Sequence, residues 1–227
     1  MTENYSQTSI GEDIYLTPKG GNYDKVLIFM HGLGDSPTSF IQLFTSKSSF
    51  CSPSTKIILL SSPLQNITVF KGLQMRSWFD VLKLGFNSPE CYNYNDIQKN
   101  SMKVFKIIKN EGKHFSGDYS KIFVGGFSQG AIMSFNIGFT TPYPIGGIIA
   151  CSGVFIPNII IEEHNKKLKV FQGHGGMDNM IVINVAKAGL ELLKKNGGEV
   201  TFKEYPEMEH TISDEEIEDI RKFLSGL

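Results

Sequence analysis

The 227-residue chain is poor in cysteine, and its charges nearly cancel. Its three cysteines, Cys51, Cys91 and Cys151, form no CxxC pair, so we expect neither a zinc site nor a disulfide framework. The formal net charge of -1 favours neither a nucleic acid nor an anionic membrane as a partner. No run of about 18 apolar residues is present, which argues against a membrane-spanning helix.

Targeting and cofactor signals are also missing. The first residues contain no basic patch followed by an apolar core, so we expect no signal peptide and a reducing, cytoplasmic location. No HExxH, phosphate-loop or EF-hand pattern is found, and we expect no metal and no cofactor. The segment "GLGDSP" superficially matches a dinucleotide-binding turn, but Pro37 stands where its third glycine is needed. We therefore reject nucleotide binding.

Short β-branched runs alternate with amphipathic helical patterns along the chain. This alternation predicts a single α/β domain over residues 1–227, with a mostly parallel central sheet and helices on both faces. The segment 12–18 is expected to add an edge strand. The predicted strands are 25–30, 56–60, 121–125, 146–152, 169–174 and 199–206, and the predicted helices are 95–111, 181–196 and 214–224. The last helix begins with a capping box, Ser213 followed by Glu216.

Residues 61–92 interrupt this alternation. Loops of such length in compact domains are usually functional or disordered. The segment contains the only tryptophan and much apolar surface, which argues against disorder. We expect it to be an insert beside the active site.

The stretch "GGFSQGAIMSF" places one serine, Ser128, between Gly126 and Gly130. It follows a predicted strand directly and opens an apolar helix. The pattern G-x-S-x-G in this context is typical of a sharp turn that lifts a nucleophilic serine above the sheet. The alternative is a glycine-rich turn whose serine is incidental.

A serine hydroxyl needs a general base, and in this arrangement the acid and then the histidine follow the serine along the chain. His210 lies after the last predicted strand and before the last helix, where the base is expected. Asp178 follows the strand 169–174 and is expected to orient that imidazole. His174 ends the same strand and is expected to be structural. The alternatives are a surface loop histidine for His210 and a capping or salt-bridging aspartate for Asp178.

An acyl-transfer site also needs amide donors for the negative oxygen of its intermediate. One donor is expected from Gln129, the residue after the serine, and the other from the loop after an early strand. The segment "HGLGDS" at 31–36 follows the strand 25–30, and we assign the second donor to the amide of Leu33.

Together, the blocks "HGLGDS", "SWFD", "GGFSQG", "GHGGMD" and "MEH" resemble the acyl-protein thioesterase and lysophospholipase-like carboxylesterases of the α/β-hydrolase superfamily. The resemblance spans nearly the whole chain, in the expected order. It implies a catalytic Ser128, Asp178 and His210 with an oxyanion hole from Leu33 and Gln129. It also implies hydrolysis of thioesters and oxyesters, including palmitoyl groups on cytosolic proteins and acyl chains of lysophospholipids.

A fatty acyl chain requires an apolar channel, and the insert 61–92 can provide one. Each methylene moved from water into such a channel contributes about 0.8 kcal/mol, so channel length would set the preferred acyl length. Core packing is the alternative, above all for Trp78 and Phe79. The expected acyl-binding residues are Leu64, Ile67, Val69, Phe70, Leu73, Met75 and Trp78.

The sequence thus predicts a serine hydrolase that removes acyl groups from S-acylated proteins. A short-chain carboxylesterase or a lysophospholipase would use the same three residues. A catalytically silent hydrolase fold that serves as a binding protein is an alternative from another class. We expect a monomer or weak homodimer, with at most transient contact with a membrane surface.

Overall fold

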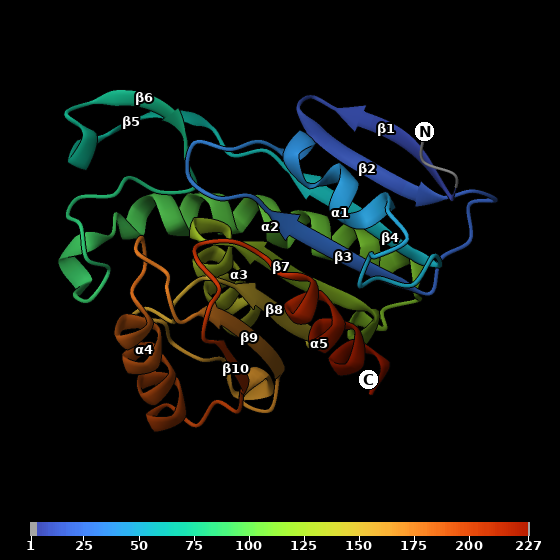
Figure 1. The fold of residues 1–227 in the computed structure, drawn as a ribbon. Helices are drawn as coiled ribbons and strands as arrows, with labels where there is room; N and C mark the ends of the chain where they lie inside the picture. The colour runs from blue at the N-terminus through green and yellow to red at the C-terminus, as the bar shows by residue number, and fades with distance from the viewer. Residues whose placement is uncertain (1–3, 227) are drawn as a thin grey trace.

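The computed structural model describes residues 4–226, so residues 1–3 and 227 of the predicted 1–227 domain lie outside the described part. Its central sheet has the strand order β1-β2-β4-β3-β7-β8-β9-β10 (Figure 1). From β4 to β10 all neighbouring strands are parallel, whereas β2 pairs antiparallel with both β1 and β4. The strands are β1 (Tyr5–Ile10), β2 (Asp13–Pro18), β3 (Lys25–Met30), β4 (Thr55–Leu60), β7 (Ile122–Phe127), β8 (Gly147–Cys151), β9 (Lys169–Gly175) and β10 (Thr201–Tyr205).

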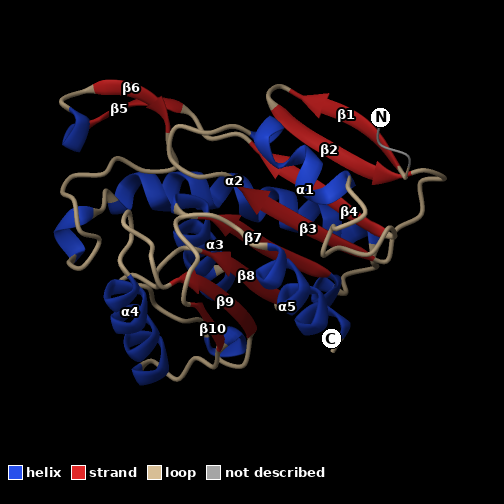
Figure 2. Ribbon diagram, viewed as in Figure 1, coloured by secondary structure: helices blue, strands red, loops and turns tan. Residues whose placement is uncertain are grey.

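Helices cover both faces of the sheet, as the alternating pattern predicted (Figure 2). Side chains alternate along β3, so that Val26 and Ile28 join one hydrophobic cluster while Leu27 and Phe29 join the other. Helices α2, α3 and α4 pack into the first cluster, and α1 and α5 into the second. The helices are α1 (Ile41–Thr45), α2 (Tyr94–His114), α3 (Gln129–Thr140), α4 (Ile183–Lys195) and α5 (Asp214–Ser225). Short 3-10 turns occur at Pro37–Phe40, Thr68–Phe70, Pro89–Cys91, Tyr119–Lys121 and Glu163–Asn165.

The N-terminal edge of the sheet differs from the prediction. Strand β2 forms where 12–18 was expected, but it is not the edge, because β1 pairs outside it. The segment of β1, "YSQTSI", is mostly exposed and has no apolar run. A strand that leaves most of its side chains in water lacks the burial pattern from which strands are predicted.

The capping box of α5 forms only in part. The Ser213 hydroxyl accepts a hydrogen bond of 3.1 Å from the backbone N–H of Glu216, as predicted. The Glu216 side chain, however, is fully buried; the Cys151 thiol and the Ser213 amide lie near its oxygens, but within residues 4–226 no hydrogen bond of good geometry reaches them. The carboxyl turns toward the sheet, where a Cβ on Gly173 would lie only 2.1 Å from its Oε1.

The insert 61–92 forms a separate two-stranded hairpin of β5 (Leu64–Ile67) and β6 (Leu73–Arg76). Figure 1 shows this hairpin standing clear of the central sheet, on the side toward which the arrow of β3 points. The chain then returns to α2 through a loop held by a bridge between Val81 and Tyr92. Within residues 4–226, no helix has the length and apolarity needed to cross a membrane.

Candidate active site

Ser128 lies in a sharp turn between β7 and α3. Its backbone has φ 55° and ψ -116°, a strained combination for a residue with a side chain. Its N–H donates to the carbonyl of Cys151 at 2.9 Å, and its own carbonyl accepts from the amides of Ala131 and Ile132. These hydrogen bonds stabilise the strained turn on both sides.

The glycines around Ser128 are required by close backbone approach. A Cβ on Gly126 would lie 2.4 Å from the carbonyl carbon of Gly130, and a Cβ on Gly130 would lie 2.0 Å from the carbonyl oxygen of Met30. No side chain fits at such distances. The glycine pattern around the serine therefore reflects the crossing of three backbone segments.

The structure brings Ser128, His210 and Asp178 into one hydrogen-bonded row. His210 Nε2 lies 2.8 Å from Ser128 Oγ, and His210 Nδ1 lies 2.7 Å from Asp178 Oδ2. The Asp178 carboxylate can only accept a hydrogen bond, so the proton of the neutral imidazole lies on Nδ1. Nε2 is then unprotonated and can accept the serine proton. The imidazole is supplied by the loop between β10 and α5, and the carboxylate by the loop after β9.

Asp178 is buried but well supplied with donors. Its Oδ1 accepts from the amides of Met180 at 2.8 Å and Ile181 at 2.9 Å. Burial opposes ionisation, but hydrogen bonds from His174, His210 and the Ile181 amide outweigh it and hold the pKa of Asp178 well below its usual range. The carboxylate therefore remains charged beside His210.

The two amides predicted to stabilise an oxyanion have no other acceptor. Within residues 4–226, neither the N–H of Leu33 nor that of Gln129 makes a hydrogen bond. The Leu33 loop is held in place by its neighbours: Gly34 N–H donates to Arg76 O at 2.8 Å, and His31 Nε2 accepts from the amide of Ser62 at 3.1 Å. Burial lowers the pKa of His31, so its imidazole stays neutral and keeps this acceptor.

The Gln129 side chain links the serine turn to the insert. Its Oε1 accepts from the amide of Trp78 at 2.8 Å, and its Nε2 donates to Ser77 Oγ and Phe79 O, both at 2.8 Å. The indole of Trp78 in turn donates to His31 O at 2.8 Å. The "SWF" segment therefore connects the two amide-bearing loops.

An apolar cavity of about 240 Å³ opens beside this row of residues. The side of the cavity next to the row contains Ser128, His210, Gln129 and Leu33. The remaining walls come from the serine turn, the insert and the loop after Asp178. Its full lining is Gly32, Leu33, Asp35, Phe70, Met75, Val81, Phe86, Phe127, Ser128, Gln129, Met180, Ile181 and His210.

Comparisons with known proteins show the family to which the chain belongs. Residues 14–227 match the phospholipase/carboxylesterase family of α/β hydrolases. The chain belongs to this family. It is 32% identical to acyl-protein thioesterase 1 of Mycosarcoma maydis, over 95% of this chain and 97% of that protein.

Solved structures of related folds extend the comparison. The Arabidopsis thaliana protein SOBER1 superimposes with a TM-score of 0.80 at 27% identity, over 89% of this chain and 98% of its own. Acyl-protein thioesterase 2 of Zea mays has a TM-score of 0.79 at 22% identity, over 94% and 97% of the two chains, and so shares the fold. The protein is thus a serine hydrolase of the phospholipase/carboxylesterase family with the predicted α/β-hydrolase fold.

Of the side chains predicted to bind an acyl chain, only Phe70 and Met75 line the cavity. Trp78 and Ile67 are fully buried in the core. For Trp78, core packing was the alternative that the sequence offered. Hydrogen bonding of Trp78 to both the Leu33 loop and Gln129 explains why it turns inward.

The other predicted acyl-binding residues lie on the hairpin away from the cavity. Leu64 and Leu73 belong to the two strands of the hairpin, and their side chains are exposed. Val69 packs against the core cluster instead. The cavity walls that the sequence did not suggest are Val81, Phe86, Phe127, Met180 and Ile181. For Met180 and Ile181, the apolar run "MIV" shortly after Asp178 was the feature of the sequence that could have indicated them.

His174 contacts the site although the sequence suggested only a structural role. Its imidazole is fully buried, and its Nε2 lies 2.7 Å from Ile181 O and 3.3 Å from Asp178 Oδ2. One ring nitrogen therefore contacts both the carboxylate and the loop that returns from it. This places His174 behind Asp178, as a residue that orients the acid.

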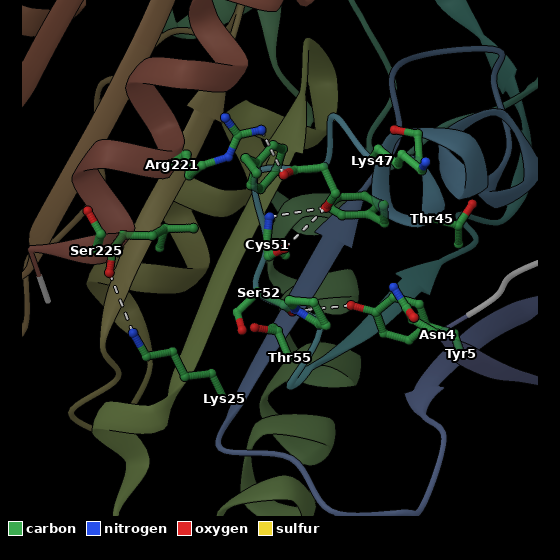
Figure 3. A pocket seen from close by; sticks show the side chains of 16 residues that line it. Asn4, Tyr5, Lys25, Thr45, Lys47, Cys51, Ser52, Thr55, Arg221 and Ser225 are labelled. Atoms are coloured by element: carbon green, nitrogen blue, oxygen red, sulfur yellow. Dashed lines mark hydrogen bonds between the residues drawn. The ribbon is translucent and has the colours of Figure 1, made fainter.

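A larger hollow of about 490 Å³ lies at the start of β3 (Figure 3), and Ser128 is not part of its lining. Two of the three cations that line it, Lys25 and Arg221, have structural partners. Lys25 Nζ contacts Leu224 O at 3.5 Å, and Arg221 donates to Ser48 O and Ser49 O at 3.0 Å. These contacts attach the end of α5 to the start of β3 and to the loop before β4, and no residue of the hydrogen-bonded row lines this hollow.

Proposed function

We propose that this protein is an acyl-protein thioesterase, which hydrolyses the thioester between a fatty acyl group and a protein cysteine. One observation carries the proposal: the row from Ser128 through His210 to Asp178 opens onto an apolar cavity. The names of the curated relatives support the thioester as the bond that is cleaved. The roles of the individual residues follow from their positions in the row.

In the first half-reaction, Ser128 Oγ attacks the acyl carbonyl carbon while His210 Nε2 takes its proton. The carbonyl oxygen becomes negative and accepts hydrogen bonds from the amides of Leu33 and Gln129. When the intermediate collapses, the carbon–sulfur bond breaks and His210 returns the proton to the leaving sulfur. The products are a free cysteine thiol and an acyl group esterified to Ser128.

In the second half-reaction, water takes the place of the thiol. His210 removes a proton from the water as it attacks the acyl ester, and the same two amides hold the oxyanion. Collapse releases the fatty acid, and Ser128 Oγ regains its proton. Side chains, amides and water account for every bond and proton, so the proposal includes no cofactor and no metal.

The ionised Asp178 keeps the imidazole in the required tautomer and stabilises the imidazolium that forms in each step. The free amides of Leu33 and Gln129 supply the electrostatic contribution, and loss of one such donor typically raises the barrier by about 3 kcal/mol. The strained backbone of Ser128 belongs to the same preorganisation, because it presents Oγ between these donors and His210.

The proposal also covers partners and location. The substrates are S-acylated proteins, with lysophospholipids or other esters as alternatives, and contact with a membrane surface is transient. All three cysteines are buried free thiols, which suits a reducing compartment, and we place the protein in the cytoplasm as a monomer or weak homodimer.

The test compares wild type with Ser128→Ala on an S-palmitoylated peptide, the matching oxyester and a lysophospholipid. We expect the substitution to lower kcat by a factor of at least about 10⁴ without unfolding the protein. A preference for the oxyester or the lysophospholipid would keep the mechanism but change the substrate. An unchanged kcat in Ser128→Ala would refute the proposed nucleophile. Failure of a fluorophosphonate probe to label Ser128 in folded protein would favour the silent binding protein.

A further inference from the structure

The volume of the apolar cavity limits the acyl chain that it holds. An apolar protein cavity of about 150 Å³ accommodates benzene, or about 25 Å³ per carbon, so about 240 Å³ takes roughly ten carbons. A sixteen-carbon palmitoyl chain would need about 400 Å³ on the same scale. The remaining carbons of a palmitoyl group therefore have no place in this cavity.

The exposure of the lining residues distinguishes the mouth of the cavity from its interior. Phe70 and Met180 are 39% and 61% exposed and form the mouth. Val81 and Ile181 are only 1% and 2% exposed and form the inner wall. Phe86 lies between these two classes, partly buried against the core, and comes from the return loop of the insert.

An unusual backbone conformation of this loop positions the Phe86 ring in the cavity wall. Phe86 has φ 52°, an unfavourable value for a residue with a bulky side chain, and it follows Gly85 at φ 103°. The buried hydroxyl of Tyr92 donates to Phe86 O at 2.6 Å, and the two rings lie 6.1 Å apart. Tyr92 thus stabilises the unusual backbone of Phe86.

The wall at Phe86 comes from a loop at the protein surface. Its neighbours Leu82 to Gly85 and Asn87 are exposed, and Phe86 is the residue of this run that packs inward and lines the cavity. Removing the ring would therefore enlarge the cavity toward this surface loop and leave room for a longer chain. The other inner wall, at Val81 and Ile181, is backed by the hydrophobic core.

We propose that this protein prefers acyl chains of about eight to ten carbons, and that Phe86 is the residue that sets this limit. The inference rests on the proposed function, because it concerns the acyl group held beside Ser128. Up to the limit, each added methylene is buried in the cavity and raises kcat/KM by about fourfold. Beyond the limit, added methylenes stay in water and bring no further gain.

The experiment measures kcat/KM for acyl thioesters of about four to sixteen carbons, below their micelle concentrations, with wild type, Phe86→Ala, Phe86→Trp and Leu84→Ala. Wild type should reach its maximum near eight to ten carbons. Phe86→Ala should move the maximum to chains about four to six carbons longer, since the lost ring occupied space for roughly that number. Leu84→Ala is the matched control, because Leu84 is 67% exposed in the same loop and does not line the cavity, and its profile should equal that of wild type.

Phe86→Trp separates an effect on the cavity from a loss of stability. Its larger ring should move the maximum to shorter chains, and destabilisation alone would not produce that shift. A wild-type profile that rises steadily to sixteen carbons, or a maximum that is the same in all variants, overturns the inference and leaves the proposed function intact. Absence of Ser128-dependent hydrolysis at every length would instead refute the proposed function, and the inference with it.

Discussion

Glu216 has a buried carboxyl between α5 and β9, and its replacement by glutamine should stabilise the protein at neutral and alkaline pH. The side chain is fully buried on α5 and packs directly on the backbone of Gly173 in β9. Burial raises the pKa of Glu216 to about 8, against opposing contributions from the Cys151 thiol and the Ser213 amide. The folded protein therefore holds a proton that the unfolded chain releases.

The magnitude follows from the difference between the two pKa values. The unfolded pKa is 4.5 and the folded pKa is about 8, so the stability that the bound proton provides is complete below 4.5 and is lost as the pH rises through 8. At pH 7 the protein is 2.5 pH units above the unfolded pKa, since 7 minus 4.5 is 2.5. At about 1.4 kcal/mol per unit, the free energy of unfolding has then fallen by about 3 kcal/mol. Above pH 8 it reaches its full size of about 5 kcal/mol.

Glutamine has nearly the same shape and does not titrate. Urea unfolding of wild type and Glu216→Gln between about pH 5 and about pH 9 should show their difference in free energy of unfolding growing by about 1.4 kcal/mol per pH unit, then levelling above about pH 8. Burial raises the pKa values of Cys151 and Tyr205, the titratable groups nearest Glu216, so neither obscures this change. The exposed Glu215→Gln is the matched control and should show no such slope. A difference that does not change with pH would refute the reasoning.

Two further predictions concern the geometry of the site. His174→Ala should lower kcat about 10- to 100-fold with little change in KM, because Asp178 loses the imidazole that orients it. Steady-state kinetics test this, and the conservative His174→Gln should restore part of the activity. Equal kinetics of His174→Ala and wild type would show that Asp178 is held by other contacts alone. Gly130→Ala should lower the free energy of unfolding by more than about 3 kcal/mol, because its Cβ would lie 2.0 Å from the carbonyl oxygen of Met30, and denaturant unfolding measures this directly; a stable Gly130→Ala protein would mean that the serine turn adapts.

Much of the site could be predicted because its residue pattern is visible in the sequence. Glycine at 126 and 130 marks the turn at Ser128, even though the contact that requires Gly130 is with Met30, far away along the chain. His210 and Asp178 could be predicted from chain order, because the loops at the carboxyl ends of parallel strands meet at one edge of the sheet. The structure places both within hydrogen-bond distance in one row with Ser128.

The cavity could not be predicted in the same way. Leu64, Ile67 and Trp78 have the apolar character that an acyl channel needs, yet two of them fill the core and one faces solvent. Trp78 lies in an irregular segment, where no helical or strand periodicity says which way a side chain points, and its direction is set by contacts with distant residues. Gln129 and His31, remote from Trp78 along the chain, determine its position.

Glu216 illustrates the same division within a regular element. Its place in the first turn of an amphipathic helix was evident from the sequence, and so was the hydrogen bond of its amide to Ser213. Its burial was not, because that depends on Gly173 of β9 leaving space for a carboxyl beneath the helix. Most strands and helices follow from periodicity, and the glycine pattern marks the serine turn, whereas the apolar cavity, the place of Phe86 in its wall and the buried acid exist only once segments far apart in the chain have packed together.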